Sequence, residues 1–334
     1  MNLLGYKNFF HIVINGGLGD SIMSLPVLKW GIENIFEENF RVSCPPQYDF
    51  LIRDWISEKY IHPFEELVSW APWVSIKKIF PNEYFVPRTN LSIFSSLSFF
   101  GKIIEEKYLS LWKWKNKVLS DKIKQKTLNI NLENSVVIPV SYRSHSKKWN
   151  SDVLKKFINF LFELGHSVIL VGGEKSQDHK NINEKFSSKK VIPEIKNENL
   201  ISFVGEITIE ETLSIMQKCK YIVGVTGGLI QLSGLTDKKI LCICTYTNIF
   251  HSLFWRNGIF GDDVWVVLPE GCKSCVNDLL VYGYDYNDCL KNLNYECTNI
   301  NIETLKQAFL DMTNDKKCQK ISEFRETLKY NYDF

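Results

Sequence analysis

The fold of this 334-residue chain is decided near its start, by Phe9-Phe-His-Ile-Val-Ile-Asn-Gly-Gly-Leu-Gly-Asp20. The run from Phe9 to Ile14 is apolar and has the length of a strand, and glycines follow it after a single residue. Ser21 then opens a segment with helical spacing. Strand, tight turn and helix in this order are typical of an α/β open sheet.

The same alternation of strands and helices continues along the chain. The first half has weaker strand signals near residues 40–44, 74–79 and 84–86. The second half predicts strands at 136–140, 167–171, 200–204, 221–225 and 239–244, and helices at 151–164 and 208–218. Ser151 is the expected N-cap of the first of these helices and Thr208 that of the second, with Glu211 in capping-box position.

The predicted architecture is two doubly wound, Rossmann-like α/β domains. At 38.9 kDa the chain is too long for one domain of ordinary size. We place the first domain at residues 1–130 and the second at 131–310. A C-terminal helix from about Ile302, with a tail over 311–334, is expected to pack back across the junction.

Composition excludes several classes of protein. A hydrophobic content of 45% with a net charge of +2 fits neither a disordered chain nor a general nucleic-acid-binding protein. No apolar run reaches the ~20 residues of a membrane-spanning helix, and the first residues lack the order of a signal peptide. We therefore expect a cytoplasmic protein, with the inner face of the membrane as a further possibility.

The opening turn contains the first candidate site, Gly16, Gly17, Gly19 and Asp20. Glycines after a strand let the backbone approach a ligand closely, and the following helix offers unpaired N–H groups to an anion. The dinucleotide fingerprint fails because its third place is Leu18, which disfavours an NAD-type oxidoreductase. Asp20 is either an N-cap or a group that takes a proton from an attacking hydroxyl.

Three further loops follow strands of the second half. Lys147 lies in Ser144-His-Ser-Lys-Lys-Trp149, Glu174 ends Val171-Gly-Gly-Glu, and Thr226-Gly-Gly228 opens a helix that carries Gln231. Ligands of parallel sheets bind beyond the carboxyl ends of the strands. Each loop alone is as consistent with a packing turn as with a binding loop.

Taken in order, these loops resemble glycosyltransferase family 9, the ADP-heptose heptosyltransferase family with the two-domain GT-B fold. The resemblance covers Gly-Gly-Leu-Gly-Asp-Ser-Ile-Met-Ser-Leu-Pro-Val-Leu from Gly16, the Lys-Lys-Trp loop with the following glycine-rich strand end, and Val223-Gly-Val-Thr-Gly-Gly-Leu-Ile-Gln231. It implies inverting transfer of a sugar from a nucleotide donor, ADP-linked by preference, to an acceptor hydroxyl.

The resemblance also implies roles for residues. Asp20 would be the general base, Lys147 would meet the donor phosphates, and the backbone N–H of Gly228 would lie at the phosphate. Glu174 would help to hold the nucleoside. The acceptor stays open between lipopolysaccharide core, another surface glycan and a protein. The alternative is a non-catalytic protein that binds a nucleotide sugar or a glycan on the same fold.

The chain departs from the family pattern in the last block. Where the family usually has Asp-Thr/Ser-Gly-x-x-His, this sequence has Thr226, Gly227, Gly228 and Gln231. Losing the acid and the histidine removes two donor contacts, which makes a different sugar a reasonable hypothesis. No Asp-x-Asp lies near a strand end of the second half, so we expect catalysis without a metal.

Four of the nine cysteines are close in sequence, at Cys272, Cys275, Cys289 and Cys297. A Cys-x-x-Cys followed by two further cysteines suits tetrahedral thiolate coordination. The sequence therefore predicts a structural zinc or iron finger over 272–297. Relatives of this family that glycosylate autotransporter proteins carry an iron-binding finger of this kind.

Residues 102–126 contain eight lysines and three acids, with apolar residues at roughly helical intervals. This pattern predicts a basic amphipathic helix or helix pair. Its aromatic residues would dock on the first domain. Alternatively the segment forms a surface for an anionic acceptor or for membrane headgroups. We expect no nucleic-acid partner.

Overall fold

The computed structural model describes residues 10–14, 18–34, 40–53, 56–62, 74–78, 83–85, 111–115, 118–140, 147–173, 188–245, 262–272, 289 and 294–323. The chain forms two compact units. Unit 1 comprises residues 1–111 with 254–258, and unit 2 comprises residues 112–253 with 259–334. No helix in the described ranges has the length and apolar character needed to cross a membrane.

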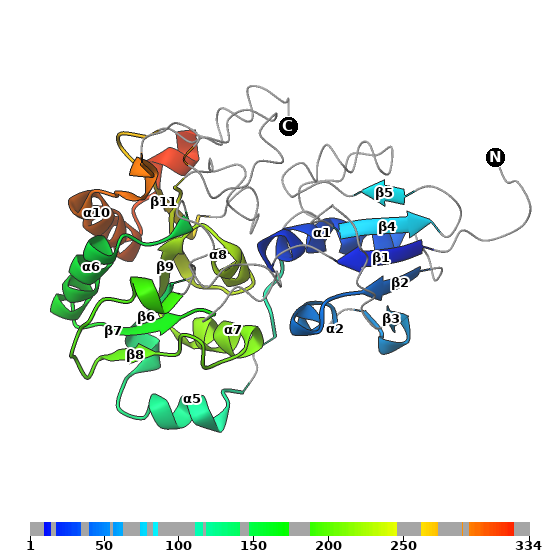
Figure 1. Ribbon diagram of the computed structural model, residues 1–334, viewed down its shortest axis with the longest axis horizontal. Helices are drawn as coiled ribbons and strands as arrows, with labels where there is room; N and C mark the ends of the chain where they lie inside the picture. The colour runs from blue at the N-terminus through cyan, green and yellow to red at the C-terminus, as the bar shows by residue number, and fades with distance from the viewer. Residues whose placement is uncertain are drawn as a thin grey trace, which may run out of the picture. The chain divides into compact units, whose positions relative to one another are not determined.

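Unit 1 contains a five-stranded sheet in the order β3-β2-β1-β4-β5 (Figure 1). Its strands are β1 (Phe10–Ile14), β2 (Phe40–Ser43), β3 (Ile61–His62), β4 (Val74–Lys78) and β5 (Glu83–Phe85). Helix α1 (Leu18–Asn34) connects β1 to β2, which run parallel, and a short α2 (Phe50–Arg53) precedes β3. Leu25 and Leu28 of α1 are buried.

This sheet is mixed rather than wholly parallel. β4 runs antiparallel to β1 and β5 runs antiparallel to β4. Only four residues separate β4 from β5, which suffices for a hairpin but not for the crossover that parallel neighbours need. The doubly wound arrangement expected for the first half therefore applies in the described part of unit 1 to β1, β2 and β3 only.

Unit 2 is built on a six-stranded sheet in the order β11-β10-β9-β6-β7-β8, and every pairing is parallel. The strands are β6 (Ser135–Pro139), β7 (Ser167–Val171), β8 (Leu200–Ser202), β9 (Tyr221–Val225), β10 (Lys239–Ile243) and β11 (Val264–Val267). All five strands predicted for this half are present. β6, β7 and β9 are buried along their whole length, as strands covered on both faces are.

Helices cover both faces of this sheet. α6 (Ser151–Glu163) and α10 (Ile302–Thr313) lie on one face, and α7 (Ile209–Lys218) and α8 (Gly228–Ser233) on the other (Figure 1). Phe157 and Phe309 meet edge to face with ring centroids 5.8 Å apart. Both rings are fully buried in the main hydrophobic core of unit 2.

The helix starts of unit 2 follow the sequence signals closely but not everywhere. Thr208 caps α7 in a complete capping box with Glu211, as predicted. The N-cap of α6 is Asn150 instead of the expected Ser151. The Asn150 side chain accepts from the backbone N–H of Asp152 and Val153. Asparagine and serine are about equally good caps, so the sequence alone did not separate the two positions.

The boundary between the units lies earlier than the predicted residue 130. Residues 112–130 belong to unit 2 because α5 (Asp121–Lys126) and the described residues 112–115 before it pack on that unit. After α10, the chain also contacts unit 2, where Trp265 Nε1 donates to Lys316 O at 2.8 Å. Residues 324–334 lie outside the described part, and the expected packing across the junction stays a prediction.

Candidate functional site

The strand order of unit 2 creates a switch point between β6 and β9. From β6 the chain proceeds to β7 and β8 on one side, and it then returns to β9, β10 and β11 on the other side. The loops after β6 and β9 therefore leave neighbouring strands in opposite directions. In open parallel sheets this is where ligands bind, beyond the carboxyl ends of the strands. The predicted loops with Lys147 and Thr226 begin at these two strand ends.

The turn after β9 is held close to the sheet. The N–H of Thr226 donates to Ile243 O at 2.9 Å, and Gly227 O accepts from both Ile230 and Gln231 at 3.0 Å as α8 begins. A Cβ atom on Gly224 would come within 2.9 Å of Ile230 Cδ1, so the glycine in β9 lets α8 pack tightly over the strand. The first N–H groups of a helix have no acceptor within that helix.

Thr226 carries the most informative side chain of this turn. It is only 4% exposed, and its Oγ1 has no hydrogen-bond partner in the described part of the chain. Leaving a buried hydroxyl unsatisfied costs about 1 to 3 kcal/mol. Gln231, one turn into α8, is also buried. From residue 226 to 231 no side chain is charged.

The loop after β6 is fixed by Trp149. Its indole Nε1 donates to Pro139 O at 3.0 Å, and the ring stacks towards Phe157 with a centroid distance of 6.3 Å. Because Asn150 next to it caps α6, the described end of the loop is anchored at both β6 and α6. Lys147 and Lys148 precede this anchor and are partly exposed. Residues 141–146 lie outside the described part.

Other predicted site residues are described less completely. Glu174 lies outside the described ranges, directly after Gly172 and Gly173 at the end of β7. Gly16 and Gly17 also lie outside them. Gly19 and the backbone of Asp20 lie in the first turn of α1, which begins at Leu18 and not near Ser21. The N-cap alternative for Asp20 is therefore wrong, since the residue is inside the helix.

The cysteine segment is described at three of its four predicted ligands. Cys272 and Cys297 are buried, Cys289 is half-buried, and Cys275 lies outside the described residues. A Cβ atom on Gly271 would come within 2.9 Å of Glu296 Oε1, which places the residues directly before Cys272 and Cys297 in contact. In the described ranges no three His, Cys, Asp or Glu side chains are arranged to hold a metal.

The basic segment differs from its prediction. Residues 111–115 and 118–120 are not helical, and α5 is the only helix among the described residues of 102–126. Trp114 is 2% exposed and docks on unit 2, whereas the aromatic residues of this segment were expected to dock on the first domain. Helical spacing was misleading here because tertiary packing, and not one helix face, buries this ring.

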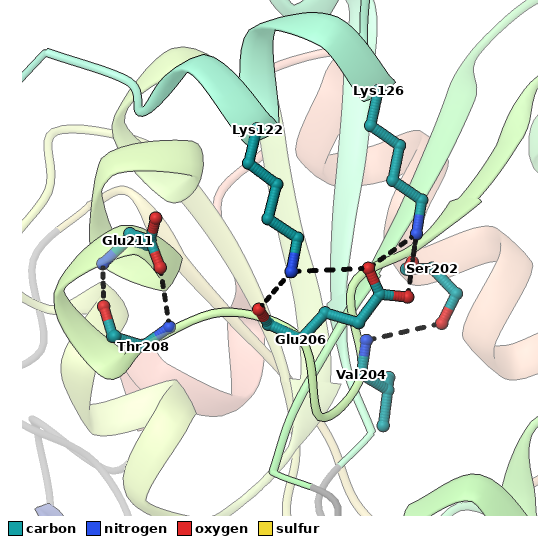
Figure 2. A network of polar contacts seen from close by, with 7 residues as sticks. All are labelled: Lys122, Lys126, Ser202, Val204, Glu206, Thr208 and Glu211. Atoms are coloured by element: carbon teal, nitrogen blue, oxygen red, sulfur yellow. Dashed lines mark hydrogen bonds and ion pairs between the residues drawn. The ribbon is translucent and has the colours of Figure 1, made fainter.

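Three of the described lysines of this segment, Lys113, Lys122 and Lys126, contact acidic residues elsewhere in unit 2. Lys126 Nζ lies 2.8 Å from Glu206 Oε1 and donates to Ser202 O at 2.6 Å (Figure 2). Lys122 donates to Glu206 O at 2.6 Å, and Lys113 is paired with Asp237. This hydrogen bond from Lys113 lowers the pKa of the Asp237 carboxyl. These lysines are thus engaged within the fold.

Two buried thiols outside the cysteine segment are chemically quiet. Burial raises the pKa of Cys219 to about 12. Burial likewise raises the pKa of Cys242 well above its ordinary value, with the neighbouring Cys244 as a second cause. Thiols that stay protonated are poor nucleophiles and poor metal ligands, which agrees with the prediction that both are ordinary core residues.

Comparison with known proteins identifies a family. The model of glycosyltransferase family 9 (heptosyltransferase) matches residues 88–277, more than half of the chain. No curated protein matches the chain in sequence.

Several solved structures share the fold. The dodecameric iron-containing glycosyltransferase TibC of enterotoxigenic E. coli has a TM-score of 0.57 at 15% identity, over 90% of this chain and 77% of that one. The ADP-heptose LPS heptosyltransferase II of E. coli has 0.53 at 12%, over 91% and 98%. A family 9 glycosyltransferase of Veillonella parvula has 0.52 at 12%, over 94% and 100%. These likenesses confirm the predicted α/β fold of the GT-B class.

Proposed function

We propose, since the chain belongs to glycosyltransferase family 9, that it transfers a sugar from a nucleotide-sugar donor to an acceptor hydroxyl with inversion at the anomeric carbon. The donor occupies the switch point of unit 2. The acceptor is a glycan, a glycolipid such as lipopolysaccharide core, or a protein.

The observation that carries this proposal is the turn between β9 and α8. It offers backbone N–H groups at a helix start together with a buried Thr226 hydroxyl that lacks a partner in the described part of the chain. A polar ligand would supply hydrogen-bond partners to both the N–H groups and the Thr226 hydroxyl. A diphosphate suits the N–H groups, and no carboxylate in residues 226–231 opposes its charge.

An ADP-linked sugar is the donor that we propose. In support, a solved TibC structure, with a TM-score of 0.57 at 15% identity, is a complex with ADP-D-β-D-heptose. Glu174 at the end of β7 would take the ribose or the base. Thr226 and Gln231 would offer neutral hydrogen-bonding groups to the sugar of the donor. Heptose and a related sugar are therefore both candidates for that sugar.

The proposed reaction is a single displacement. Asp20 takes the proton from the acceptor hydroxyl as its oxygen attacks C1 of the donor sugar, and the bond from C1 to the phosphate oxygen breaks. The electron pair of that bond leaves with the nucleoside diphosphate. The proposed role of Gly16, Gly17 and Gly19 is to let the acceptor approach the backbone between β1 and α1 closely, because glycine has no side chain.

The leaving diphosphate gains negative charge as the bond breaks. Lys147 is the proposed cation that meets it, and the N–H groups at Gly227 and Gly228 are the proposed donors. Trp149 and Asn150 hold the end of the Lys147 loop through the contacts to Pro139 and to α6. This set of groups neutralises the leaving group without a metal ion.

We propose a separate, structural metal site at Cys272, Cys275, Cys289 and Cys297. In support, the Glu296 side chain, directly before Cys297, reaches Gly271, directly before Cys272, and thiolates suit zinc or iron. Elemental analysis of the purified chain should find about one equivalent of zinc or of iron. Less than about a tenth of an equivalent would contradict the site.

The transfer itself is tested with a panel of ADP- and GDP-linked sugars and a lipopolysaccharide-core acceptor. Release of the nucleoside diphosphate together with a product heavier by one sugar is the expected result. Binding of a nucleotide sugar without turnover on any acceptor would favour a non-catalytic binding protein. No binding of any nucleotide would refute the proposed donor site.

A further inference from the structure

We call residues 112–126 the strap. They begin directly after Leu111, at which the first stretch of unit 1 ends, and they belong to unit 2. The strap is described at 112–115 and 118–126. Its contacts are concentrated at two places. One is the carboxyl end of α7 and α8, and the other is the edge of the sheet just before α7 begins.

The first contact is made by the backbone of Trp114, which bridges two helices. Its N–H donates to Leu235 O at 2.8 Å, just after α8, and its carbonyl accepts from Gln217 Nε2 at 2.8 Å, near the end of α7. The adjacent Lys113 pairs with Asp237. A single strap residue thus fixes the ends of both helices on this face of the sheet.

The side chain of Gln217 indicates that this bond is specific. The residue is 6% exposed, and its Oε1 has no hydrogen-bond partner in the described part of the chain. An apolar side chain would fill the same place without a buried unsatisfied oxygen. The hydrogen bond from Gln217 Nε2 to Trp114 O therefore has to offset the free-energy cost of burying Oε1 without a partner, a cost that an apolar side chain would avoid.

The second contact lies at the other end of α7. Lys122 and Lys126 of α5 reach Glu206, two residues before the Thr208 cap, and Lys126 also covers Ser202 O on the edge strand β8 (Figure 2). α7 has 10 residues and is therefore about 15 Å long. The strap thus contacts unit 2 beside both ends of this helix.

The strap contact at Leu235 is joined to the donor turn by a short, buried run of chain. Backbone hydrogen bonds continue without a break from Gly227 O, through α8, to the N–H of Thr236. Every residue from 229 to 236 is buried. Since α8 has six residues, Trp114 contacts the chain roughly 10 Å from the turn at Gly227. This buried helix therefore connects the strap contact to the donor turn.

We propose that the strap positions α7 and α8 for nucleotide binding, so that docking of residues 112–126 and occupancy of the Thr226–Gly228 turn stabilise each other. This inference rests on the proposed donor site. Trp114, Gln217 and Lys126 are positioning residues, because they act through α8 and not on the ligand. Binding couplings of this kind are reciprocal.

The test uses ADP as the probe and the full chain. Calorimetric titration compares wild type with Gln217→Leu, which removes the donor to Trp114 O. We expect the dissociation constant of ADP to rise about two- to thirtyfold. In wild type, saturating ADP should slow hydrogen exchange at the Trp114 amide. If saturating ADP leaves hydrogen exchange at the Trp114 amide unchanged, the proposed coupling between the strap and the donor turn is wrong.

A matched pair of lysine variants keeps the proposal falsifiable if Gln217→Leu does not fold. Lys126→Met breaks the contacts to Glu206 and Ser202, whereas Lys124→Met on the same helix breaks only a local pair with Asp121. We expect Lys126→Met to weaken ADP binding about twofold or more, Lys126→Arg to restore it, and Lys124→Met to leave it unchanged. Equal ADP affinity in all three would refute the strap.

The two proposals fail in distinguishable ways. A wild-type chain that binds no ADP refutes the donor site, and with it the nucleotide end of the coupling. A wild-type chain that binds ADP, with the same affinity in Gln217→Leu and Lys126→Met, refutes the strap alone. A purely structural role would lower the melting temperature of these variants and leave ADP affinity, measured well below melting, unchanged.

Discussion

Two strand-to-helix connections, one in each unit, are both glycine-rich in sequence and differ in charge. In unit 1, β1 leads through glycines to α1, which has Asp20 in its first turn. In unit 2, β9 leads through Thr226 and a glycine pair to α8, and residues 226–231 carry no charge. A carboxylate suits the proposed general base, and backbone N–H groups at a helix start suit the proposed diphosphate. The proposed mechanism therefore divides the labour between the units.

The largest expected effect comes from removing the carboxylate of unit 1. Asp20→Asn should slow transfer about 10²- to 10⁴-fold, the usual contribution of a general base, because the acceptor hydroxyl loses its proton acceptor. The measurement is the initial rate of product formation. Asp152→Asn is the matched control, since Asp152 lies in the first turn of α6. If Asp152→Asn slows transfer as much as Asp20→Asn does, the loss reflects the removal of an acidic residue from the start of a helix and not the loss of a base.

Removing the proposed cation of unit 2 is the matching change. Lys147→Met deletes the charge that would meet the diphosphate, and hydrogen bonds to charged groups contribute about 1.5 to 3 kcal/mol. ADP affinity should fall about ten- to a hundredfold in calorimetric titration. Lys148→Met, at the adjacent and similarly half-exposed position, should retain most of the affinity. Equal affinity in both variants would show that Lys147 does not meet the phosphates.

Removing only the hydroxyl should separate binding from folding. Thr226→Val should weaken donor binding about three- to tenfold while the free energy of unfolding stays level or rises, because Oγ1 has no partner in the described part of the chain. In the control, Thr236→Val, stability should fall by about 1 kcal/mol, since Thr236 Oγ1 donates to Ser233 O at 2.7 Å. Loss of stability in Thr226→Val would contradict the assignment.

The smallest expected effect is a pH dependence confined to unit 2. Burial, together with the charge of Lys220, lowers the pKa of His166, which lies edge to face with Tyr221 and Phe309. His166 therefore contributes stability that is full above its unfolded pKa of about 6.5 and is lost as pH falls towards its folded pKa.

Denaturant unfolding of wild type and His166→Phe at pH 7.5 and at pH 5 measures this contribution. The wild type should lose more stability on acidification than the variant does, whatever their difference at pH 7.5. The same pH dependence in both would assign the effect to other groups.

Much of unit 2 could be predicted from sequence because its strands are buried on both faces. Such strands give unbroken apolar runs, and the run from Tyr221 to Val225 coincides with β9. The capping box at Thr208 marks the start of α7 in the same way. Local signals of this kind need no knowledge of the rest of the fold.

What sequence could not give depends on contacts between distant residues. Trp114 and Gln217 are 103 positions apart, and nothing local to either predicts their hydrogen bond. The direction of β4 against β1 depends on the path of the chain and not on its apolar pattern. For the same reason the spacing in residues 102–126 indicated a helix also at 111–115 and 118–120, where the structure has none.

For the candidate site, sequence order was more informative than any single motif. The loops with Lys147 and Thr226 follow β6 and β9, and the structure shows that these strands are neighbours at a switch point. The buried, unsatisfied state of Thr226 Oγ1 is invisible in sequence, since it depends on which atoms surround the turn. Asp20, Glu174 and Cys275 stay predictions at the level of their side chains.

The division of labour between the two units can be measured as the dissociation constant of ADP in Asp20→Asn and in Lys147→Met, determined side by side by calorimetry. We expect wild-type affinity in Asp20→Asn and a loss of about ten- to a hundredfold in Lys147→Met. The reverse pattern, with affinity lost in Asp20→Asn and kept in Lys147→Met, would contradict the proposed division.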